Sequence, residues 1–187
     1  MSVFALGASP RRGGNSDSLL DIAVRELESA GHAVTRYQLA DHQVAPCLAH
    51  DDCHACPIED DFAELATAAM DASAVLFALP VYYWGVPAQL KAFIDRHIHY
   101  YRGRKYSARA IGLIIVAGGD GLDEAEAQMT NFLCKGAHAA LPRDQIQVLS
   151  AYASEVGDAI ADPVLRAKAH KFGQSLAAQL AAGGDAD

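Results

Sequence analysis

Continuous apolar runs alternate with helix-forming segments along this chain, and the alternation constrains the fold more than any other feature. Residues 74–79 and 110–116 are almost wholly apolar, which is typical of strands buried on both faces of a sheet. Shorter runs predict further strands at residues 2–8, 33–39 and 145–149. Strands separated by helices indicate a parallel sheet, because each crossover brings the chain back in the same direction.

The intervening segments repeat apolar residues at the helical period. We expect helices at residues 15–30, 60–70 and 124–135, one that begins at Pro87 and one that follows Asp162. The chain is therefore expected to be an α/β protein with a doubly wound five-stranded parallel sheet and helices on both faces. Its 187 residues suit a single domain, residues 1–182, followed by a frayed tail at residues 183–187.

Charge and hydropathy exclude two classes of partner. The 15 basic and 23 acidic residues give a net charge of −8, whereas a nucleic-acid partner requires a basic stripe. No apolar run approaches the roughly 18 residues of a membrane span. The first apolar stretch is too short for a secretion signal, so we expect a cytoplasmic protein with no nucleic-acid or membrane partner and with reduced thiols.

The first expected strand leads into a loop that reads Gly-Ala-Ser-Pro-Arg-Arg-Gly-Gly-Asn-Ser, residues 7–16. A strand-to-helix turn directs free backbone N–H groups and the positive end of a helix dipole at one point, which suits an anion. Side-chain donors come from Ser9, Arg11, Asn15 and Ser16. The loop lacks the glycine fingerprints of dinucleotide and Walker sites, so it favours a terminal monophosphate. An ordinary turn with capping residues is the alternative.

A second turn, residues 80–85, follows the third expected strand and reads Pro-Val-Tyr-Tyr-Trp-Gly. Aromatic side chains at a strand end can flank a flat ring, and backbone N–H groups can reach its heteroatoms. Neighbouring residues point in different directions, so one or two of Tyr82, Tyr83 and Trp84 are expected to touch such a ring. The alternative is that the three side chains cap the core.

Three loops are expected to form one ligand crevice, because the carboxyl ends of parallel strands meet at the same edge of a sheet. They are residues 6–16, 80–85 and 117–121. In the third loop, Gly118 and Gly119 would let a flat ring approach the backbone, although a plain β-turn would favour the same residues.

The two turns resemble the signatures of the NAD(P)H-dependent FMN reductase family, which belongs to the flavodoxin-like flavoproteins. The first is Ser9-Pro10-Arg11-x-x-Gly14-Asn15-Ser16-x-x-Leu19, and the second runs from Leu79 to Arg96. The resemblance implies a flavodoxin-like fold, bound FMN, NAD(P)H as co-substrate and a homodimer or homotetramer. The FMN contacts that we expect are Ser9, Arg11, Gly14, Asn15, Ser16, Pro80, Val81, Tyr82, Tyr83, Trp84, Gly85, Gly118 and Gly119.

The function that the resemblance implies is an FMN-dependent NAD(P)H oxidoreductase that passes electrons to a quinone, a flavin or another small acceptor. No catalytic side chain is expected, because flavin N5 carries the hydride. Two alternatives stay open. A flavodoxin-type electron carrier would suit the acidic charge, and an iron–sulfur flavoprotein would suit the cysteines.

Three of the four cysteines lie in one loop, where Cys47, His50, Cys53 and Cys56 follow one another at intervals of three residues. The spacing resembles the cluster loop of the iron–sulfur flavoproteins, but His50 replaces a cysteine and Cys56 comes too early for the last one. We therefore predict no bound metal, with a zinc or iron–sulfur site on these four residues as the alternative.

A segment after the Pro87 helix is rich in basic and aromatic residues. It is a candidate for contact with the nicotinamide phosphate or the acceptor, although a solvated helix end or a subunit interface would use the same residue types. Its members are His97, His99, Tyr100, Tyr101, Arg102 and Arg104.

Overall fold

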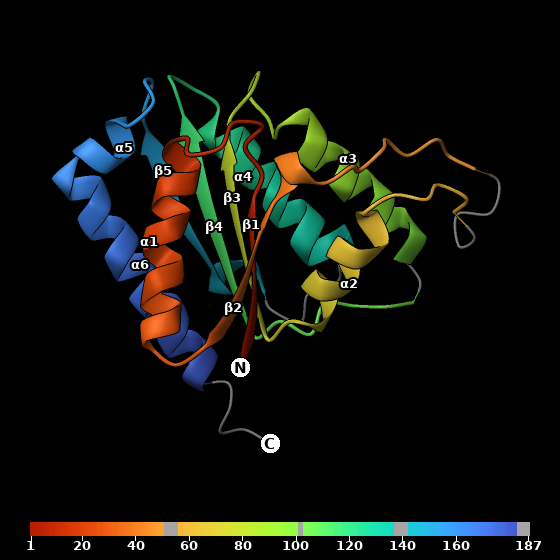
Figure 1. Ribbon diagram of the computed structural model, residues 1–187, viewed down its shortest axis with the longest axis horizontal. Coiled ribbons are helices and arrows are strands. Elements are labelled where there is room, and N and C mark those ends of the chain that lie inside the picture. Colours follow the sequence, from red (N-terminus) through yellow and green to blue (C-terminus); the bar gives the residue numbers. More distant parts are fainter. Residues whose placement is uncertain (51–55, 101–102, 137–141, 183–187) are drawn as a thin grey trace.

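A wholly parallel five-stranded sheet in the order β2-β1-β3-β4-β5 forms the centre of the computed structural model, which describes residues 1–50, 56–100, 103–136 and 142–182 (Figure 1). The strands are β1 (Ser2–Gly7), β2 (Ala33–Gln38), β3 (Ala74–Pro80), β4 (Ala110–Ala117) and β5 (Ile146–Tyr152). This confirms the predicted fold class. The strand order reverses between β1 and β3, so the loops that follow these two strands are neighbours.

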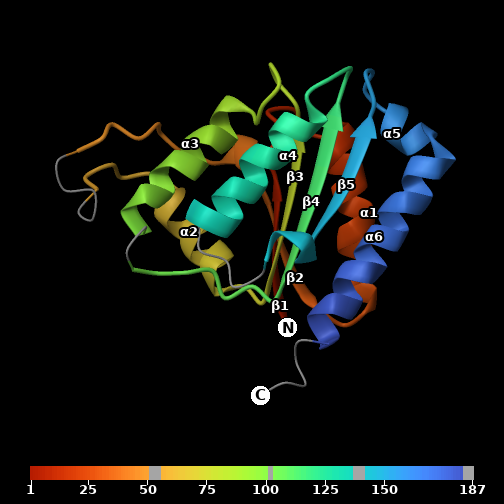
Figure 2. The ribbon, with the colours of Figure 1, turned by 180° about the vertical axis from the view of Figure 1, so that it is seen from behind.

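Helices cover both faces of the sheet (Figures 1 and 2). One face carries α1 (Asn15–Ser29), α5 (Asp158–Ala161) and α6 (Pro163–Ala182), and the other carries α2 (Phe62–Asp71), α3 (Ala88–Arg96) and α4 (Leu122–Asn131). The segment expected as one helix at 124–135 changes to a π-helical turn at Phe132–Gly136, and α5 was not expected. No helix in the described ranges is long and apolar enough to cross a membrane.

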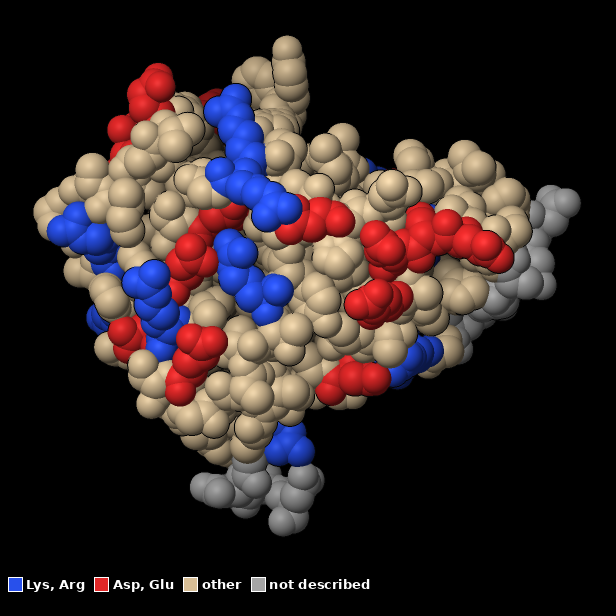
Figure 3. All heavy atoms as spheres, viewed as in Figure 1, with Lys and Arg blue, Asp and Glu red and all other residues tan. Residues whose placement is uncertain are grey.

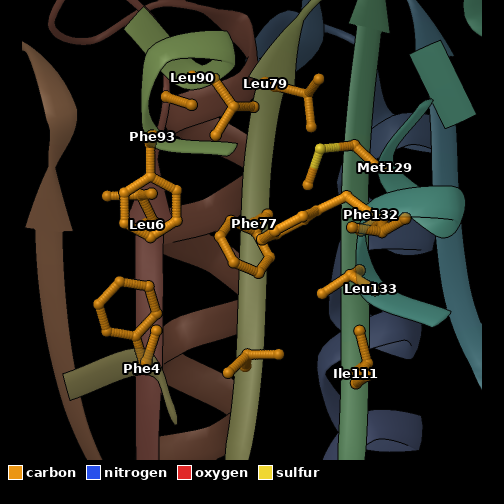
Figure 4. Packing of buried hydrophobic residues seen from close by; sticks show 14 of the residues in the cluster. Phe4, Leu6, Phe77, Leu79, Leu90, Phe93, Ile111, Met129, Phe132 and Leu133 are labelled. Carbon is orange, nitrogen blue, oxygen red and sulfur yellow. The ribbon is translucent and has the colours of Figure 1, made fainter. Parts of the chain in front are cut away.

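Two apolar layers hold the helices to the sheet. Under α2, α3 and α4, Phe4 of β1 and Phe77 of β3 pack with Phe93 and Phe132 (Figure 4). β4 is buried along its whole length, as its continuous apolar sequence predicts. On the other face Gly112 lets α6 come close, because a Cβ at this position would lie 2.9 Å from Leu76 and from Phe172. The packing fixes the carboxyl edge of the sheet as a rigid platform for loops.

Candidate functional site

Four loops meet at the carboxyl edge of the sheet, one more than the sequence indicated (Figure 1). The three expected loops follow β1, β3 and β4, and the fourth is the connection between β5 and α5, residues 153–157. No recognisable motif marks the fourth loop. Only its position at the end of the last parallel strand could have indicated that it belongs to the site.

Asn15 connects the first loop to the fourth. Its Nδ2 donates to the carbonyl oxygens of Ala153 and Glu155, at 3.3 and 2.8 Å, and its Oδ1 accepts the N–H groups of Gly157 and Ala159, at 3.1 and 3.2 Å. The side-chain amide is therefore occupied within the protein. The Asn15 backbone N–H lies in the first turn of α1.

A cavity of about 270 Å³ lies between the four loops. It brings together most of the residues that the sequence assigned to cofactor binding, and it adds residues of the fourth loop and the end of β4. The lining consists of Ser9, Arg11, Gly14, Asn15, Ser16, Pro80, Val81, Tyr82, Val116, Gly118, Ala153, Ser154 and Val156. Ser154 is held by a bond from its hydroxyl to the Gly118 carbonyl oxygen, at 2.8 Å.

The loop between β1 and α1 presents unused donors to this cavity. The buried Ser9 Oγ accepts the Arg11 N–H at 3.0 Å, which leaves the hydroxyl hydrogen available, and Ser16 Oγ has no partner in the described part of the chain. No side chain caps the first turn of α1. Arg12 pairs with Asp41, whereas Arg11 has no ion pair among the described residues. Hydroxyls, amide N–H groups and a free guanidinium form a set that fits a phosphate.

The turn after β3 holds two aromatic residues in a left-handed conformation. Tyr82 and Gly85 exchange backbone hydrogen bonds of 2.9 and 3.1 Å, and the residues between them, Tyr83 and Trp84, have φ angles of 48° and 57°. Such a conformation costs an L-residue roughly 1–2 kcal/mol, and it persists where the surrounding structure enforces it. The surrounding structure therefore holds the turn in this conformation.

The loop after β4 fixes this turn. The Asp120 carboxylate accepts the N–H of Gly121 at 2.8 Å and Nε1 of Trp84 at 3.2 Å, and these two bonds lower the pKa of Asp120. Gly121 has a φ of 90°, and a Cβ on it would lie 2.7 Å from the Trp84 Cα. Only glycine allows this close approach.

An open cavity of about 280 Å³ lies beside this turn and gathers a second group of expected contacts. Its lining is Val81, Tyr83, Trp84, Gly118, Gly119 and Asp120. Tyr83 is 95% exposed, so its ring covers no core. Gly85 lines neither cavity; it closes the turn and lies against Gln128, whose Oε1 would be 3.1 Å from a Cβ at Gly85.

His97 lies in the core, so neither the candidate contact with the nicotinamide phosphate or acceptor nor a solvated helix end applies to it. It is 5% exposed and packs against the rings of Phe62, Phe93 and Phe132. The Phe93 carbonyl oxygen can only accept, so Nδ1 donates to it at 2.8 Å and Nε2 accepts from the Tyr106 hydroxyl at 3.0 Å. Burial lowers the pKa of His97 to about 4, which keeps the ring neutral.

The cysteine loop extends from the body beside α2 and α3 (Figure 1). The two sides of the loop meet at Ala45 and Asp60, which we call its neck. Arg96 of α3 contacts both sides there: its Nη1 lies 2.7 Å from Asp60 Oδ2 and 3.2 Å from the Ala45 carbonyl oxygen. Asp60 Oδ2 also accepts the Ala45 N–H at 2.8 Å. These contacts therefore join the two ends of the loop to each other and to α3.

Beyond the neck, Cys47, His50 and Cys56 line a cavity of about 230 Å³. In the described part of the chain, no three potential ligands converge as a metal site would require. Cys53 lies outside the described residues, as do Tyr101, Arg102 and the expected tail at 183–187. Whether this loop holds a metal stays a prediction.

Comparison with known proteins agrees with the two turn sequences. The profile of the family described as NADPH-dependent FMN reductase matches residues 1–153. An iron–sulfur flavoprotein of Archaeoglobus fulgidus is 33% identical over 84% of this chain and 73% of its own, and one of Methanosarcina thermophila is 30% identical over 64% of each. Among solved structures, an NAD(P)H:quinone oxidoreductase from Methanothermobacter marburgensis superposes with a TM-score of 0.68 at 20% identity, covering 94% of this chain and 96% of that one.

Proposed function

Because the chain belongs to the NADPH-dependent FMN reductase family, we propose that it binds FMN in the cavity at the carboxyl edge of the sheet and carries reducing equivalents from NAD(P)H to a small acceptor there. Bound FMN supplies the hydride chemistry at N5 of its ring. One observation carries the proposal: a single cavity of about 270 Å³ joins the anion-binding donors of the first loop to the turn that bears the aromatic residues.

The phosphate end of the cofactor would be held by the loop between β1 and α1. Ser9 and Ser16 would donate their hydroxyls, Arg11 its guanidinium, and the first turn of α1 its backbone N–H groups. Each hydrogen bond to a charged group contributes about 1.5–3 kcal/mol. These residues fit a terminal monophosphate. The side-chain hydrogen bonds of Asn15 to the loop after β5 keep the phosphate-binding residues in position before a ligand arrives.

The ring end would lie between the turn after β3 and the loop after β4. The backbone N–H groups of Tyr83 and Trp84 have no acceptor among the residues described, so they are available to ring oxygens and nitrogens. A Cβ on Gly119 would meet no atom within 4 Å, which leaves room for a flat group beside the backbone. The chain thereby binds and orients the ring without a protein acid or base.

The open side of the site supports access by a nicotinamide and then by an acceptor. The cavity beside Tyr83 and Trp84 is open to solvent, and both rings are exposed. Basic and acidic side chains are interspersed on the face shown in Figure 3, which supports a small molecule rather than a nucleic acid as the partner. We also propose that the chain forms a homodimer or homotetramer in which this site lies near the subunit interface.

The purified protein tests the proposal directly. We expect a flavin absorption spectrum, release of FMN on denaturation at one per chain, and NADH or NADPH oxidation that accelerates when a quinone is added. Stoichiometric FAD, or a protein that binds neither flavin, would contradict it. A flavodoxin-type electron carrier, the first alternative, would bind FMN but would not oxidise either nicotinamide by itself. An iron–sulfur flavoprotein, the second alternative, would also contain iron and sulfide.

A further inference from the structure

Beneath the loop between β1 and α1, here called the phosphate loop, two buried oxygen atoms have no hydrogen-bond donor among the described residues. One is Oδ1 of Asp17, the third residue of α1, and the other is Oε1 of Gln38, the last residue of β2. Their residues are 1% and 6% exposed. A buried oxygen without a donor is costly, and two of them in one place require a physical explanation.

The two oxygens share the space beside Gly7. A Cβ built on Gly7 would lie 2.3 Å from Gln38 Oε1 and 2.9 Å from Asp17 Oδ1, so the sum of these distances is the greatest separation that the oxygens can have. The other atoms of both groups hold the phosphate loop from below. Asp17 Oδ2 accepts the Gly13 N–H at 3.0 Å, and Gln38 Nε2 donates to the Ser9 carbonyl oxygen at 2.9 Å.

Reversing the Gln38 amide does not remove the conflict. Nε2 would then turn toward Asp17, but Oε1 would face the Ser9 carbonyl oxygen, and neither of those oxygens carries a hydrogen. Two acceptors, the Ser9 carbonyl oxygen and Asp17 Oδ1, therefore face one amide that can donate on one side only. One additional proton resolves the arrangement, and a carboxyl group can carry it.

We propose that Asp17 is a protonated, neutral acid that donates its Oδ1 proton to Gln38 Oε1 and thereby positions the loop that binds the FMN phosphate. A hydrogen bond through this proton would satisfy both oxygens, and the bonds to Gly13 and Ser9 would be kept. The neutral form also avoids a negative charge directly beneath a phosphate. Asp17 and Gln38 are positioning residues, since neither lines the cavity itself.

Neighbouring groups shift the pKa of Asp17 in opposite directions, and burial has the largest effect. Desolvation raises the pKa of Asp17 and the nearby Asp21 raises it further, whereas Arg36, the Gly13 N–H and the Gln38 side chain lower it. Arg36 on β2 is itself paired with Asp21 at 3.0 Å. In the loop above, Arg12 is paired with Asp41, and Arg11 lines the cavity. The dipole of α1 favours the ionised form, so burial must outweigh it.

The protonation state of Asp17 can be measured in the apoprotein, without any ligand. We expect the Asp17 carboxyl carbon, followed by NMR and assigned with Asp17→Asn, to titrate above the ordinary pKa of 3.8. Because the folded pKa is raised, the stabilising effect of this proton is complete below 3.8 and is lost as pH rises through the folded value. Asp17→Asn, which retains a donor at every pH, should therefore melt higher than the wild type at pH 8 and lose this advantage toward pH 4. A titration midpoint at or below 3.8, or one that leaves Asp17 fully ionised at the pH of the FMN-binding measurements, would overturn the proposal.

Flavin binding provides the second test, and this arm rests on the proposed function. Asn mimics the neutral acid, so Asp17→Asn should bind FMN at least as tightly as the wild type, whereas Asp17→Ala should bind it about tenfold more weakly. Riboflavin, which lacks the phosphate, should respond less to either change. A tenfold loss with Asp17→Asn would show that the carboxylate form is needed. If the wild type binds no FMN, the proposed function fails, but the NMR titration still determines whether Asp17 carries the proton.

Discussion

Arg96 and Asp60 form an ion pair whose side chains are only 3% and 6% exposed, although the pair lies at the base of a surface loop. Arg96 also places its guanidinium 4.7 Å from the centre of the Phe62 ring, which covers the charge with apolar surface. The pair fixes the path of the chain on both sides of the cysteine loop. This contact sets the geometry of the loop neck.

The first prediction is that Arg96→Met lowers the free energy of unfolding by about 3–5 kcal/mol, because it leaves the Asp60 carboxylate buried and unpaired. Urea denaturation measures the effect. Lys91→Met provides the control, since Lys91 is on the same helix and pairs with Asp95 in an exposed position, where a change within about 0.5 kcal/mol is expected. Equal effects of the two substitutions would contradict the prediction.

The second prediction concerns the phosphate loop. Ser9→Ala and Arg11→Ala should each weaken FMN binding roughly tenfold or more, because each removes a donor to a charged group. Flavin fluorescence titration of the apoprotein gives the dissociation constants. Arg12→Ala is the matched control, since Arg12 is already paired with Asp41. If Ser9→Ala and Arg11→Ala bind FMN like the wild type, the phosphate lies elsewhere.

The third prediction is a loss of stability in acid that arises from His97. Its pKa is lowered from 6.5 to about 4 in the folded chain, so the unfolded chain binds the proton more readily. The contribution, on the order of 3 kcal/mol, is complete above pH 6.5 and disappears as pH falls toward 4.

Denaturation curves at several pH values measure this dependence. The double substitution His97→Phe and Tyr106→Phe removes the titrating group without leaving the Tyr106 hydroxyl unpaired. Its stability should change less between pH 6.5 and 4 than that of the wild type. An unchanged slope would assign the acid sensitivity to other groups.

The fourth prediction is that the chain forms a homodimer or homotetramer through the turn after β3. Tyr83 is 95% exposed and Trp84 is exposed beside the open cavity, and a large uncovered aromatic surface marks a contact site. Light scattering at micromolar concentration should give the mass of two or four chains. Tyr83→Asn, which tolerates the left-handed φ, should shift the distribution toward the single chain. A monomeric wild type would refute this.

The fifth prediction is that the cysteine loop holds no iron–sulfur cluster, although two relatives are iron–sulfur flavoproteins. A four-iron cluster is bound by four thiolates as a rule, and this loop offers Cys47, Cys53 and Cys56 with His50 in place of the fourth. Protein purified without oxygen should contain neither iron nor sulfide. Near-stoichiometric iron with sulfide would reverse the conclusion, and zinc alone would identify a structural site.

Much of the fold follows from local sequence patterns. The apolar run of β4 could only be a strand covered on both faces, and the helical periods of α1 and α6 fixed their position against the sheet. The turns after β1 and β3 were found because their glycine, proline and aromatic residues act on the backbone next to them. Such patterns are readable because their cause lies within a few residues.

Tertiary structure decided where individual side chains are used. Asn15 forms its bonds with residues 138 to 144 positions away, His97 enters an aromatic core rather than a ligand site, and the fourth loop of the site carries no motif. Asp17 and Gln38 meet only because β1 and β2 are neighbours and Gly7 leaves space between them. The sequence by itself determined the strands, the helices and the two turns that define the family, since these depend on local periodicity and backbone preference. The hydrogen-bond partners and protonation states depend on which distant segments are packed together, and only the folded chain determines that.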